Sequence, residues 1–424
     1  MAGSTAVPGR DTRLPVGAAL AARAAALGTR LAADPGVRLA VMVVVGLRLL
    51  LGCAALLGIS AVSTDPAAGE HLEAQTRSTA TLWPLVGPFE RWDALWYLHL
   101  ARDGYSPGGG DGAYEPMFVI LIRAVALPLG GNVGLAAWLL VTASLVVALA
   151  VVWHLVAGVL GDERARLTVL AMAVYPAAFF MLAPYPEPVF LALSAGALLA
   201  GSRRHWAAAG GLAALAVLCR PQGVVVLLAL GVEALVAART SSAAGRAGGA
   251  VTGTLRRLDP AAVVATVFPV VPLAVWFAYC RFSLDLALGP LTPLHDRWGH
   301  HAAWPWTVLA DSLAQIGTGQ KLEEIGNLVM VVVVAAAIPL MWRRLPPAWT
   351  AYTVATLLIA VCGEARWTPL MSWMRYAAVL FPVFALAGLW AVGAPAWARR
   401  GLALTALAAQ LWLFELYVHY TFVA

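Results

Sequence analysis

Long apolar runs separated by short polar segments dominate the chain. Runs of 14 to 25 apolar residues recur along most of its length, and a helix needs about 20 apolar residues to cross a bilayer. The pattern therefore predicts an all-α polytopic membrane protein with about eleven transmembrane helices. The expected spans are 38–60, 134–158, 167–182, 188–201, 206–219, 222–238, 260–280, 326–341, 349–362, 376–397 and 401–421.

The composition agrees with that class and excludes others. Hydrophobic residues make up 61% of the chain and charged residues only 12%, which leaves too little polar surface for a soluble protein. The formal charge of +6 comes from arginines gathered in short loops, which is typical of topology signals, so we expect no nucleic-acid partner. The four cysteines have no CxxC spacing and predict neither a metal site nor a disulfide framework.

The basic loops predict which side of the membrane each segment faces. If segment 117–132 does not cross, every arginine-rich short loop falls on one side, which the positive-inside rule identifies as the cytoplasm. Arg123, Pro128 and two glycines interrupt that segment, so it is either a span or a re-entrant piece. On the non-crossing arrangement, residues 1–37 form a cytoplasmic tail and 38–424 form a single transmembrane domain.

The opposite side then collects the unusual polar residues. The first external loop, 61–133, is rich in acidic and aromatic residues and is expected to carry juxtamembrane helices; a second large loop covers 281–325. An ionisable group beside a membrane span marks a functional site by default. We therefore expect a multi-pass protein of the cell membrane with a cytoplasmic N-terminus and an external site.

Asp93 is the first candidate residue of that site. It lies in a polar and aromatic segment in which Trp96 and Tyr97 follow at i+3 and i+4 and would share its helix face. Two interpretations stay open: a functional carboxylate, or the N-cap of a juxtamembrane helix, a position that aspartate favours. Arg91 would point elsewhere on a helix, and is either a phosphate-binding residue or an exposed arginine that binds nothing.

Three more charged residues lie where external loops meet apolar runs. Glu187 stands between two prolines at the mouth of a span, as a site residue or as a first-turn acid favoured by the helix dipole. Arg220 and Arg375 each either bind an anion such as a lipid phosphate, through two parallel hydrogen bonds, or snorkel to the headgroups. The histidines of loop 281–325 have no spacing typical of a metal site, so no metal is expected.

Several segments follow one another in an order shared with a known family. They are Arg91-Trp92-Asp93 with Trp96-Tyr97, Ala101 and Gly104-Tyr105; Tyr114-Glu115-Pro116-Met117-Phe118; Tyr185 with Glu187; Arg220-Pro221-Gln222-Gly223; and Ser372 to Tyr376 leading to Phe381-Pro382. In this order they resemble the PIG-V-type mannosyltransferases, integral-membrane enzymes of the GT-C class. The chain departs from that pattern at Val119, where a second proline is common, and at Pro186 and Pro188, where small polar residues are usual.

The resemblance implies a GT-C-like fold and transfer of mannose from a polyprenyl-phosphate-mannose donor to an acceptor hydroxyl outside the cytoplasm, with inversion. Asp93 would be the catalytic base. The acceptor would be a glycolipid, polysaccharide or protein, and no cofactor is implied beyond the lipid-linked sugar as co-substrate. The residues implied in donor or acceptor binding are Arg91, Trp92, Trp96, Tyr97, Glu187, Arg220, Arg375 and Tyr376.

Independent reasoning from residue chemistry is compatible with this activity, because a carboxylate base, a phosphate-binding arginine and apolar grooves are what such a reaction requires. Two alternatives stay open. The same mechanism could use another polyprenyl-phosphate sugar, such as arabinose or glucose. A lipid-linked sugar transporter or a non-catalytic scaffold is the alternative outside enzymes, although a transporter would show internal repeats and charged groups near the bilayer midplane.

Overall fold

The computed structural model describes residues 25–26, 28–61, 83–108, 110–243, 258–317, 322–421 and 423. Most of the expected tail 1–37 and the polar start of loop 61–133 lie outside these residues. The regular secondary structure of the described residues is helical, apart from one two-stranded antiparallel sheet. In this sheet β1 (His301–Ala302) pairs with β2 (Gly363–Glu364). The α-helices are α2 (Pro35–Ala61), α4 (Trp83–Val86), α5 (Asp93–Asp103), α6 (Pro116–Ala126), α7 (Val133–Leu160), α8 (Asp162–Ala173), α9 (Glu187–Ser202), α10 (Trp206–Val217), α11 (Val224–Ala243), α13 (Pro260–Val267), α14 (Val270–Phe282), α15 (Leu291–Trp298), α16 (Pro305–Gly317), α17 (Leu322–Arg344), α18 (Pro347–Val361), α19 (Trp373–Ala377), α20 (Phe381–Gly393) and α21 (Ala396–Val418). Single 3-10 turns are η1 (Gly87–Phe89), η2 (Asp111–Ala113), η3 (Leu127–Leu129), η4 (Ala178–Met181) and η5 (Pro221–Gly223).

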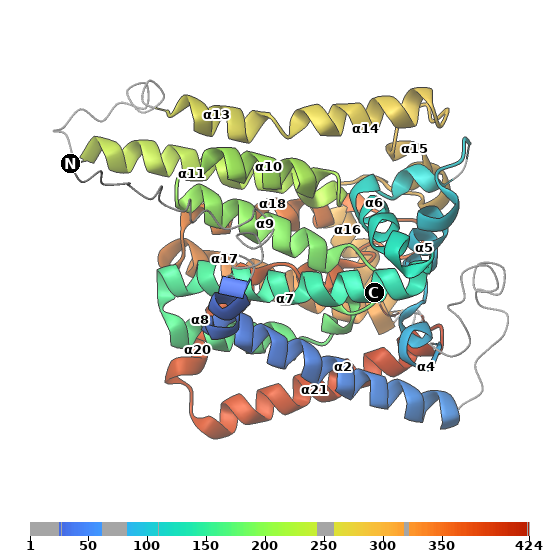
Figure 1. Cartoon of the computed structure of the whole chain (residues 1–424), viewed down its shortest axis with the longest axis horizontal. Coiled ribbons are helices and arrows are strands. Elements are labelled where there is room, and N and C mark those ends of the chain that lie inside the picture. The colour runs from blue at the N-terminus through green and yellow to red at the C-terminus, as the bar shows by residue number, and fades with distance from the viewer. Residues whose placement is uncertain are drawn as a thin grey trace, which may run out of the picture.

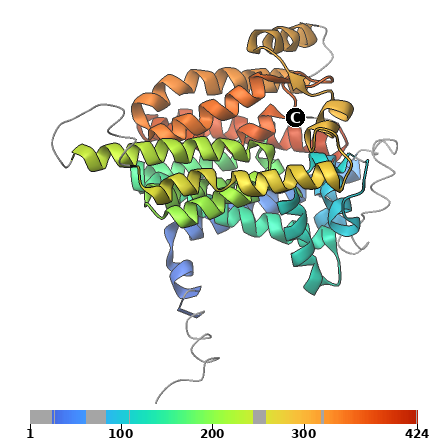
Figure 2. The same cartoon turned by 90° about the horizontal axis from the view of Figure 1, so that it is seen from above.

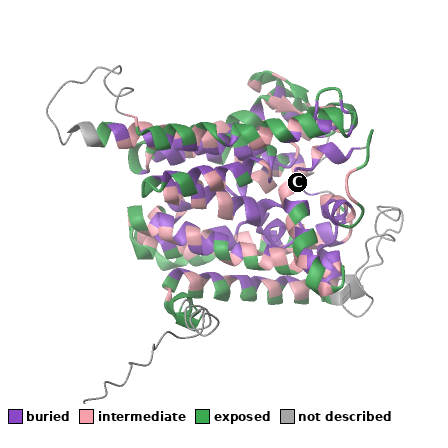
Figure 3. Ribbon diagram, turned by 45° about the horizontal axis from the view of Figure 1, so that its top comes forward, coloured by how far each residue is buried: buried purple, intermediate pink, exposed green. Residues whose placement is uncertain are grey.

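Six stretches of the described chain are helical, long and apolar enough to cross a membrane: Pro35–Gly58, Val133–Leu160, Pro221–Thr240, Pro260–Phe282, Glu323–Arg344 and Ala396–Val418. Shorter apolar helices cover Pro116–Leu129, Glu187–Ser202, Trp206–Val217, Pro347–Val361 and Phe381–Gly393. Large apolar side chains are exposed on the outer faces, including Val264, Val275 and Phe282, and Figure 3 shows buried faces turned toward the centre of the bundle. The predicted class of all-α polytopic membrane protein is confirmed.

The long helices lie side by side and share one direction, so the molecule has two distinct ends (Figures 1 and 2). Helix α7 lies inside the bundle and packs against α2, α8 and α9. Helices α8 and α20 pack closely, since a Cβ on Gly388 would lie 2.7 Å from the backbone oxygen of Arg164. Helices α4, α5, α6 and α15 gather at one end, at the right of Figure 1.

Prolines divide two of the expected spans. The span expected at 167–182 is helical only to Ala173, because Pro176 lacks the N–H that would continue the helix and disfavours helical backbone before it. The span expected at 260–280 is divided into α13 and α14, and Pro272 removes the bond that would return to Phe268. Both differences were visible in the sequence as prolines inside apolar runs.

Segment 117–132, which the sequence left as a span or a re-entrant piece, forms a short helix at one end of the bundle. Helix α6 has 11 residues, or about 16 Å at 1.5 Å per residue, against about 30 Å of hydrocarbon in a bilayer. It packs against α5 and the start of the bundle helix α7. Because α6 lies beside α5 at the right of Figure 1, it does not run the length of the bundle.

Candidate active site

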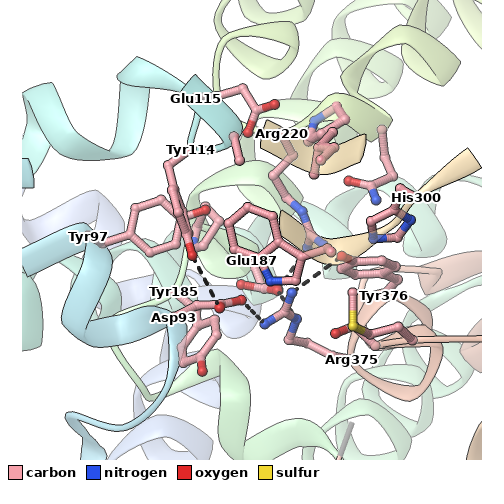
Figure 4. Close-up of a pocket in the computed structure, with 18 residues that line it drawn as sticks. Asp93, Tyr97, Tyr114, Glu115, Tyr185, Glu187, Arg220, His300, Arg375 and Tyr376 are labelled. Carbon is pink, nitrogen blue, oxygen red and sulfur yellow. Dashed lines mark hydrogen bonds and ion pairs between the residues drawn. The ribbon is translucent and has the colours of Figure 1, made fainter. Parts of the chain in front are cut away.

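A polar cavity of about 130 Å³ opens at the end of the bundle that carries α5 and α6. Segments far apart in the sequence meet there: the start of α5, the loop before α6, the start of α9, η5, α15 and α19. Figure 4 shows the side chains of these segments converging on one group of charges. The lining residues are Asp93, Tyr97, Ala113, Tyr114, Glu115, Tyr185, Pro186, Glu187, Arg220, Pro221, Gln222, Leu294, Trp298, His300, Met371, Ser372, Arg375 and Tyr376.

Asp93 is the first residue of α5 and turns its carboxylate into this cavity. The N-cap position belongs to Trp92, whose backbone has φ 57° and ψ −127° and which makes no side-chain cap hydrogen bond. The interpretation of Asp93 as the N-cap is therefore wrong. A tryptophan with positive φ is strained, and the strain lies directly before the residue that points into the cavity.

Arg91 is turned away from the cavity and fixes the backbone that precedes Asp93. It is 2% exposed, and its guanidinium donates hydrogen bonds to the carbonyl oxygens of Gly87, Glu90 and Val418 at 2.7 to 3.0 Å. This guanidinium does not line the cavity. Arg91 was expected either to be exposed or to bind phosphate. Neither expectation matches its position, because its guanidinium already donates to carbonyl groups.

Two tyrosines hold the same backbone, one from the segment before α9 and one from α21. Tyr185 donates to the carbonyl oxygen of Arg91 at 3.1 Å, and Tyr417, near the end of α21, donates to the carbonyl oxygens of Phe89 and Arg91 at 2.9 and 3.2 Å. Trp92 packs against Tyr420, with ring centroids 6.1 Å apart. Trp92 and Arg91 thus fasten the segment before α5 to the C-terminal helix.

Arg375 reaches Asp93 from α19. Its Nη1 donates to Oδ2 of Asp93 at 2.7 Å, and its Nε lies 3.2 Å from Oε1 of Glu187. Helix α19 begins after Ser372, which has φ 64°. Thus a residue with positive φ precedes each of the two short helices that carry this ion pair.

Helix α17 holds the segment that leads to Arg375. Buried Glu324 accepts a hydrogen bond from the backbone N–H of Leu370 at 3.2 Å, and buried Asn327 accepts one from Met374 at 2.9 Å. The hydroxyl of Tyr175 donates to the carbonyl oxygen of Met374 at 2.8 Å. Nothing in the sequence pairs these positions with Arg375, since they lie about 50 to 200 residues away from it.

Glu187 joins the two arginines. It is the first residue of α9, and its Oε1 also lies 3.0 Å from Nη1 of Arg220. The sequence left each guanidinium either to bind an anion or to snorkel, and in the structure both lie beside this carboxylate. Arg220 is placed by the tight turn at η5, where a Cβ on Gly223 would lie 2.4 Å from Cα of Val217, so glycine is required there.

Aromatic rings enclose the charges. Tyr376 lies beneath both guanidiniums, with the Cζ atoms of Arg220 and Arg375 4.6 and 5.1 Å from its ring centre, a cation–π geometry. Tyr97 and Tyr114 meet edge to face at 5.1 Å and both line the cavity. Trp96 lies behind them, stacked on Tyr114 at 5.7 Å. Of the aromatic residues expected in the site, Tyr97 and Tyr376 line it and Trp96 supports it.

The four charged groups form a chain with one accessible end: Asp93, Arg375, Glu187, Arg220. Their formal charges cancel, two negative against two positive. The Asp93 side chain is 33% exposed, while those of Glu187 and Arg220 are 1% and 4% exposed. The contacts of Glu187 are ion pairs without hydrogen-bond alignment, so its two oxygens and Nη1 of Arg220 have no aligned partner among the described residues. A chain of buried charges that is paired but incompletely hydrogen-bonded can still accept polar atoms of a ligand.

Other lining residues were not expected from the sequence as site residues. Tyr114 and Glu115 were noted only as part of the aromatic-proline segment, and Gln222 only as part of a turn. Burial raises the pKa of Glu115 to about 8. The pKa of His300 is lowered by burial and, to a smaller extent, by the positive charge of nearby His301. The one signal available in the sequence was an acid directly before Pro116 in an aromatic segment.

The β1–β2 pair lies beside the cavity, directly after the lining residue His300. It joins loop 281–325 to the segment before α19, and the backbone N–H of Arg366 donates to the carbonyl oxygen of Trp298 at 3.1 Å. Gly299 allows this close approach, since it has φ 63° and a Cβ there would lie 2.5 Å from Cβ of Arg366. Within the described ranges no three His, Cys, Asp or Glu side chains gather as metal ligands.

Comparisons with known proteins give weak likenesses. No family model matches the chain, and no curated protein matches it. ArnT from Cupriavidus metallidurans bound to undecaprenyl phosphate is 16% identical, with a TM-score of 0.46 over 76% of this chain and 58% of that one. The oligosaccharyltransferase of Archaeoglobus fulgidus, in a complex with Zn and sulfate, is 15% identical, with a TM-score of 0.41 over 87% and 53%.

A second structure of that oligosaccharyltransferase, tethered to an acceptor peptide containing the NVT sequon, is 14% identical, with a TM-score of 0.41 over 89% and 56%. This chain thus spans between half and two thirds of the length of the structures that it resembles. At such scores the likeness shows neither a family nor an activity. The resemblance of the sequence to the mannosyltransferases stays a prediction.

Proposed function

We propose that this chain is a membrane glycosyltransferase that moves a sugar from a polyprenyl-phosphate donor to an acceptor hydroxyl. In the proposed step Asp93 takes the proton of the acceptor hydroxyl while its oxygen forms a bond to the anomeric carbon of the sugar. The bond from that carbon to the phosphate oxygen breaks, and the lipid phosphate leaves with the electron pair. Attack opposite the leaving phosphate would invert the anomeric carbon.

The observation that carries this proposal is the accessible carboxylate at the end of a buried chain of charges. Asp93 is one-third exposed at the cavity, and Arg375 holds it at 2.7 Å. A general base must lie within hydrogen-bond reach of the proton that it takes, and an accessible carboxylate in the cavity meets that requirement. Glu187 is too buried to meet an incoming hydroxyl first, so we assign it to positioning the two arginines.

Arg220 and Arg375 would stabilise the departing phosphate. Because both are paired with Glu187, a donor phosphate must share them with this carboxylate rather than find them free. Their aromatic surroundings exclude water and strengthen such contacts. The proposed step therefore draws its positive charge from guanidinium groups and uses no metal cofactor.

The direction of the helices supports an external position for the site. Helices α9 and α11 begin at the cavity and α10 ends there, so the turn at Arg203 and Arg204 lies at the far end. The turn joining α20 to α21, which is followed by Arg399 and Arg400, also lies at the far end (Figure 1). With basic turns in the cytoplasm, the cavity would face the outside of the cell membrane.

The resemblance to PIG-V-type enzymes makes mannose the expected sugar. The acceptor would be a glycolipid, polysaccharide or protein. These finer assignments are tested by incubating the purified full chain with labelled polyprenyl-phosphate mannose, arabinose or glucose and membrane glycolipids, followed by product analysis. Transfer of mannose supports the whole proposal; transfer of another sugar corrects the donor alone. No product from any donor, with an intact folded protein, would overturn the proposed activity.

A further inference from the structure

Glu115 is a nearly buried carboxyl that lines the cavity and has no part in the proposed proton transfer. It is 5% exposed and lies at the N-cap of α6 without capping that helix. Among the described residues its carboxyl makes no hydrogen bond or ion pair with another side chain. Its own backbone N–H is a hydrogen-bond partner that lowers its pKa, and the carboxyl keeps acceptor capacity toward a cavity that a ligand can enter.

Gln222 lines the same cavity with a second unused polar atom. Its Oε1 is buried and has no hydrogen-bond partner in the described chain. The two residues are held in a fixed relation, because the backbone N–H of Met117 donates to the carbonyl oxygen of Leu218 at 2.9 Å. This bond joins the start of α6 to the loop before η5. The positive charge that lowers the pKa of Glu115 is that of Arg220, which Glu187 already engages.

Burial favours the protonated form of Glu115. Burial raises its pKa to about 8, and Arg220 lowers it only in part. The other titratable groups whose charges interact with it are Tyr97, Tyr105, Cys219 and Cys280. A protonated carboxyl offers one O–H donor and a carbonyl acceptor. With the amide of Gln222, the cavity thus holds neutral donors and acceptors of the kind that match hydroxyl groups.

Glu115 lies apart from the proposed base. Figure 4 shows Glu115 on one side of the pocket and Asp93 with Arg375 on the other, with Arg220 between them. A phosphate is expected to favour the guanidiniums over a neutral acid. A sugar between the two sides would present hydroxyls to the neutral groups, since a hydroxyl both donates and accepts.

We propose that Glu115 and Gln222 form a recognition subsite for a hydroxyl of the transferred sugar, and that Glu115 is a specificity-determining residue. This inference rests on the proposed function and names the part of the cavity that selects the sugar. A site built to bond a substrate hydroxyl rejects the analogue that lacks it, because its own buried polar groups are then left unpaired.

The test combines Glu115 variants with donors that lack single hydroxyls. Wild type, Glu115→Gln and Glu115→Ala are assayed with the accepted polyprenyl-phosphate sugar and with each of its monodeoxy analogues. Binding of every donor is measured separately on the same purified proteins. For one deoxy donor, wild type should lose about tenfold to a hundredfold in kcat/KM and in affinity. With the parent donor, Glu115→Ala should have a kcat/KM lower than that of wild type by a similar factor. Its kcat/KM should then fall little further when the parent donor is replaced by that deoxy analogue. Glu115→Gln, which keeps a donor and an acceptor, should retain part of the discrimination.

Asp111→Asn is the matched control. Asp111 is a buried acid of the same loop, 3% exposed, which accepts bonds from the N–H and hydroxyl of Ser106 and does not line the cavity. Its substitution should change activity by the same factor with every donor. If Glu115→Ala also shows the same factor for parent and all deoxy donors, Glu115 is structural and the inference is wrong.

Failure of the proposed function and failure of the role of Glu115 give different results. Donor binding without any transfer would overturn the proposed function. The affinities for the parent and deoxy donors would still decide whether Glu115 recognises a sugar hydroxyl. Binding of no lipid-linked sugar by folded wild type would overturn both.

Discussion

Arg375 donates a hydrogen bond to Asp93 at 2.7 Å across 282 positions of the sequence. The same guanidinium lies 3.2 Å from Glu187 through a different nitrogen, Nε. One side chain thus fixes both an accessible and a buried carboxylate. This double contact explains why an arginine, with its planar fork of donors, stands at that position.

Replacing Arg375 should therefore impair both catalysis and folding. Arg375→Gln is expected to lower kcat/KM by about tenfold to a hundredfold through the loss of charge-assisted bonds, and to lower the melting temperature because Glu187 keeps only one cationic partner. Arg375→Lys should recover only part of either property, since one ammonium cannot reproduce two contacts made by separate nitrogens. Steady-state kinetics and thermal unfolding in detergent measure the two effects. Full recovery by lysine would contradict the fork geometry.

Glu115 should make the stability of the fold depend on pH. Its pKa is about 8 in the folded protein and 4.5 in an ordinary glutamate. Its stabilising contribution is then complete below pH 4.5 and is lost as pH rises through 8. Wild type should lose on the order of a few kcal/mol between these limits that Glu115→Gln does not lose. Thermal unfolding of both proteins from pH 5 to 9 checks this difference. Parallel curves would show that Glu115 titrates normally.

Arg91 should act through stability and position, although it does not touch the cavity. Arg91→Ala leaves the carbonyl groups of Gly87, Glu90 and Val418 without their donor, at a cost on the order of 3 kcal/mol, and frees the segment before the catalytic helix. We expect a lower melting temperature together with a lower kcat. Arg102→Ala is the control, because that arginine is 35% exposed and pairs only at the surface, where an ion pair contributes about 0 to 1 kcal/mol. Equal behaviour of the two variants would refute the anchoring role.

The two ends of the bundle should lie on opposite sides of the membrane. In a background without cysteine, Ser202→Cys at the last residue of α9 and Asp296→Cys on α15 place thiols at exposed positions of the two ends. An impermeant reagent added to intact cells should label position 296 and not position 202. Labelling of both, or of position 202 alone, would contradict the proposed orientation.

The sequence predicted the helical class and most of the helices, because apolar runs of membrane length carry a strong signal. It misplaced the end of the helix before Pro176, because the apolar run was taken as one span although this proline lies inside it. It also named six residues that line the cavity among its candidates: Asp93, Tyr97, Glu187, Arg220, Arg375 and Tyr376.

What the sequence could not provide was pairing between distant segments. Arg220 was expected to bind an anion or to snorkel, and nothing in its neighbourhood indicates the contact with Glu187, 33 positions earlier. The inward turn of Arg91 toward Val418 depends on the last helix, 327 positions later. Glu115 was overlooked because its burial depends on α6, η5 and α15 meeting around it.

The central claim is that Asp93 takes the proton of the acceptor, and Asp93→Asn tests it most directly. The variant keeps the shape of the side chain but cannot accept that proton. Asp103→Asn is the matched control, since Asp103 is the last residue of the same helix, is exposed, and pairs with Arg102 and His99 outside the cavity. With the donor that wild type uses, Asp93→Asn should bind donor and unfold near the wild-type temperature but lose about 10² to 10⁴ in kcat, while Asp103→Asn keeps wild-type turnover. Turnover of Asp93→Asn within a few-fold of wild type would contradict the account.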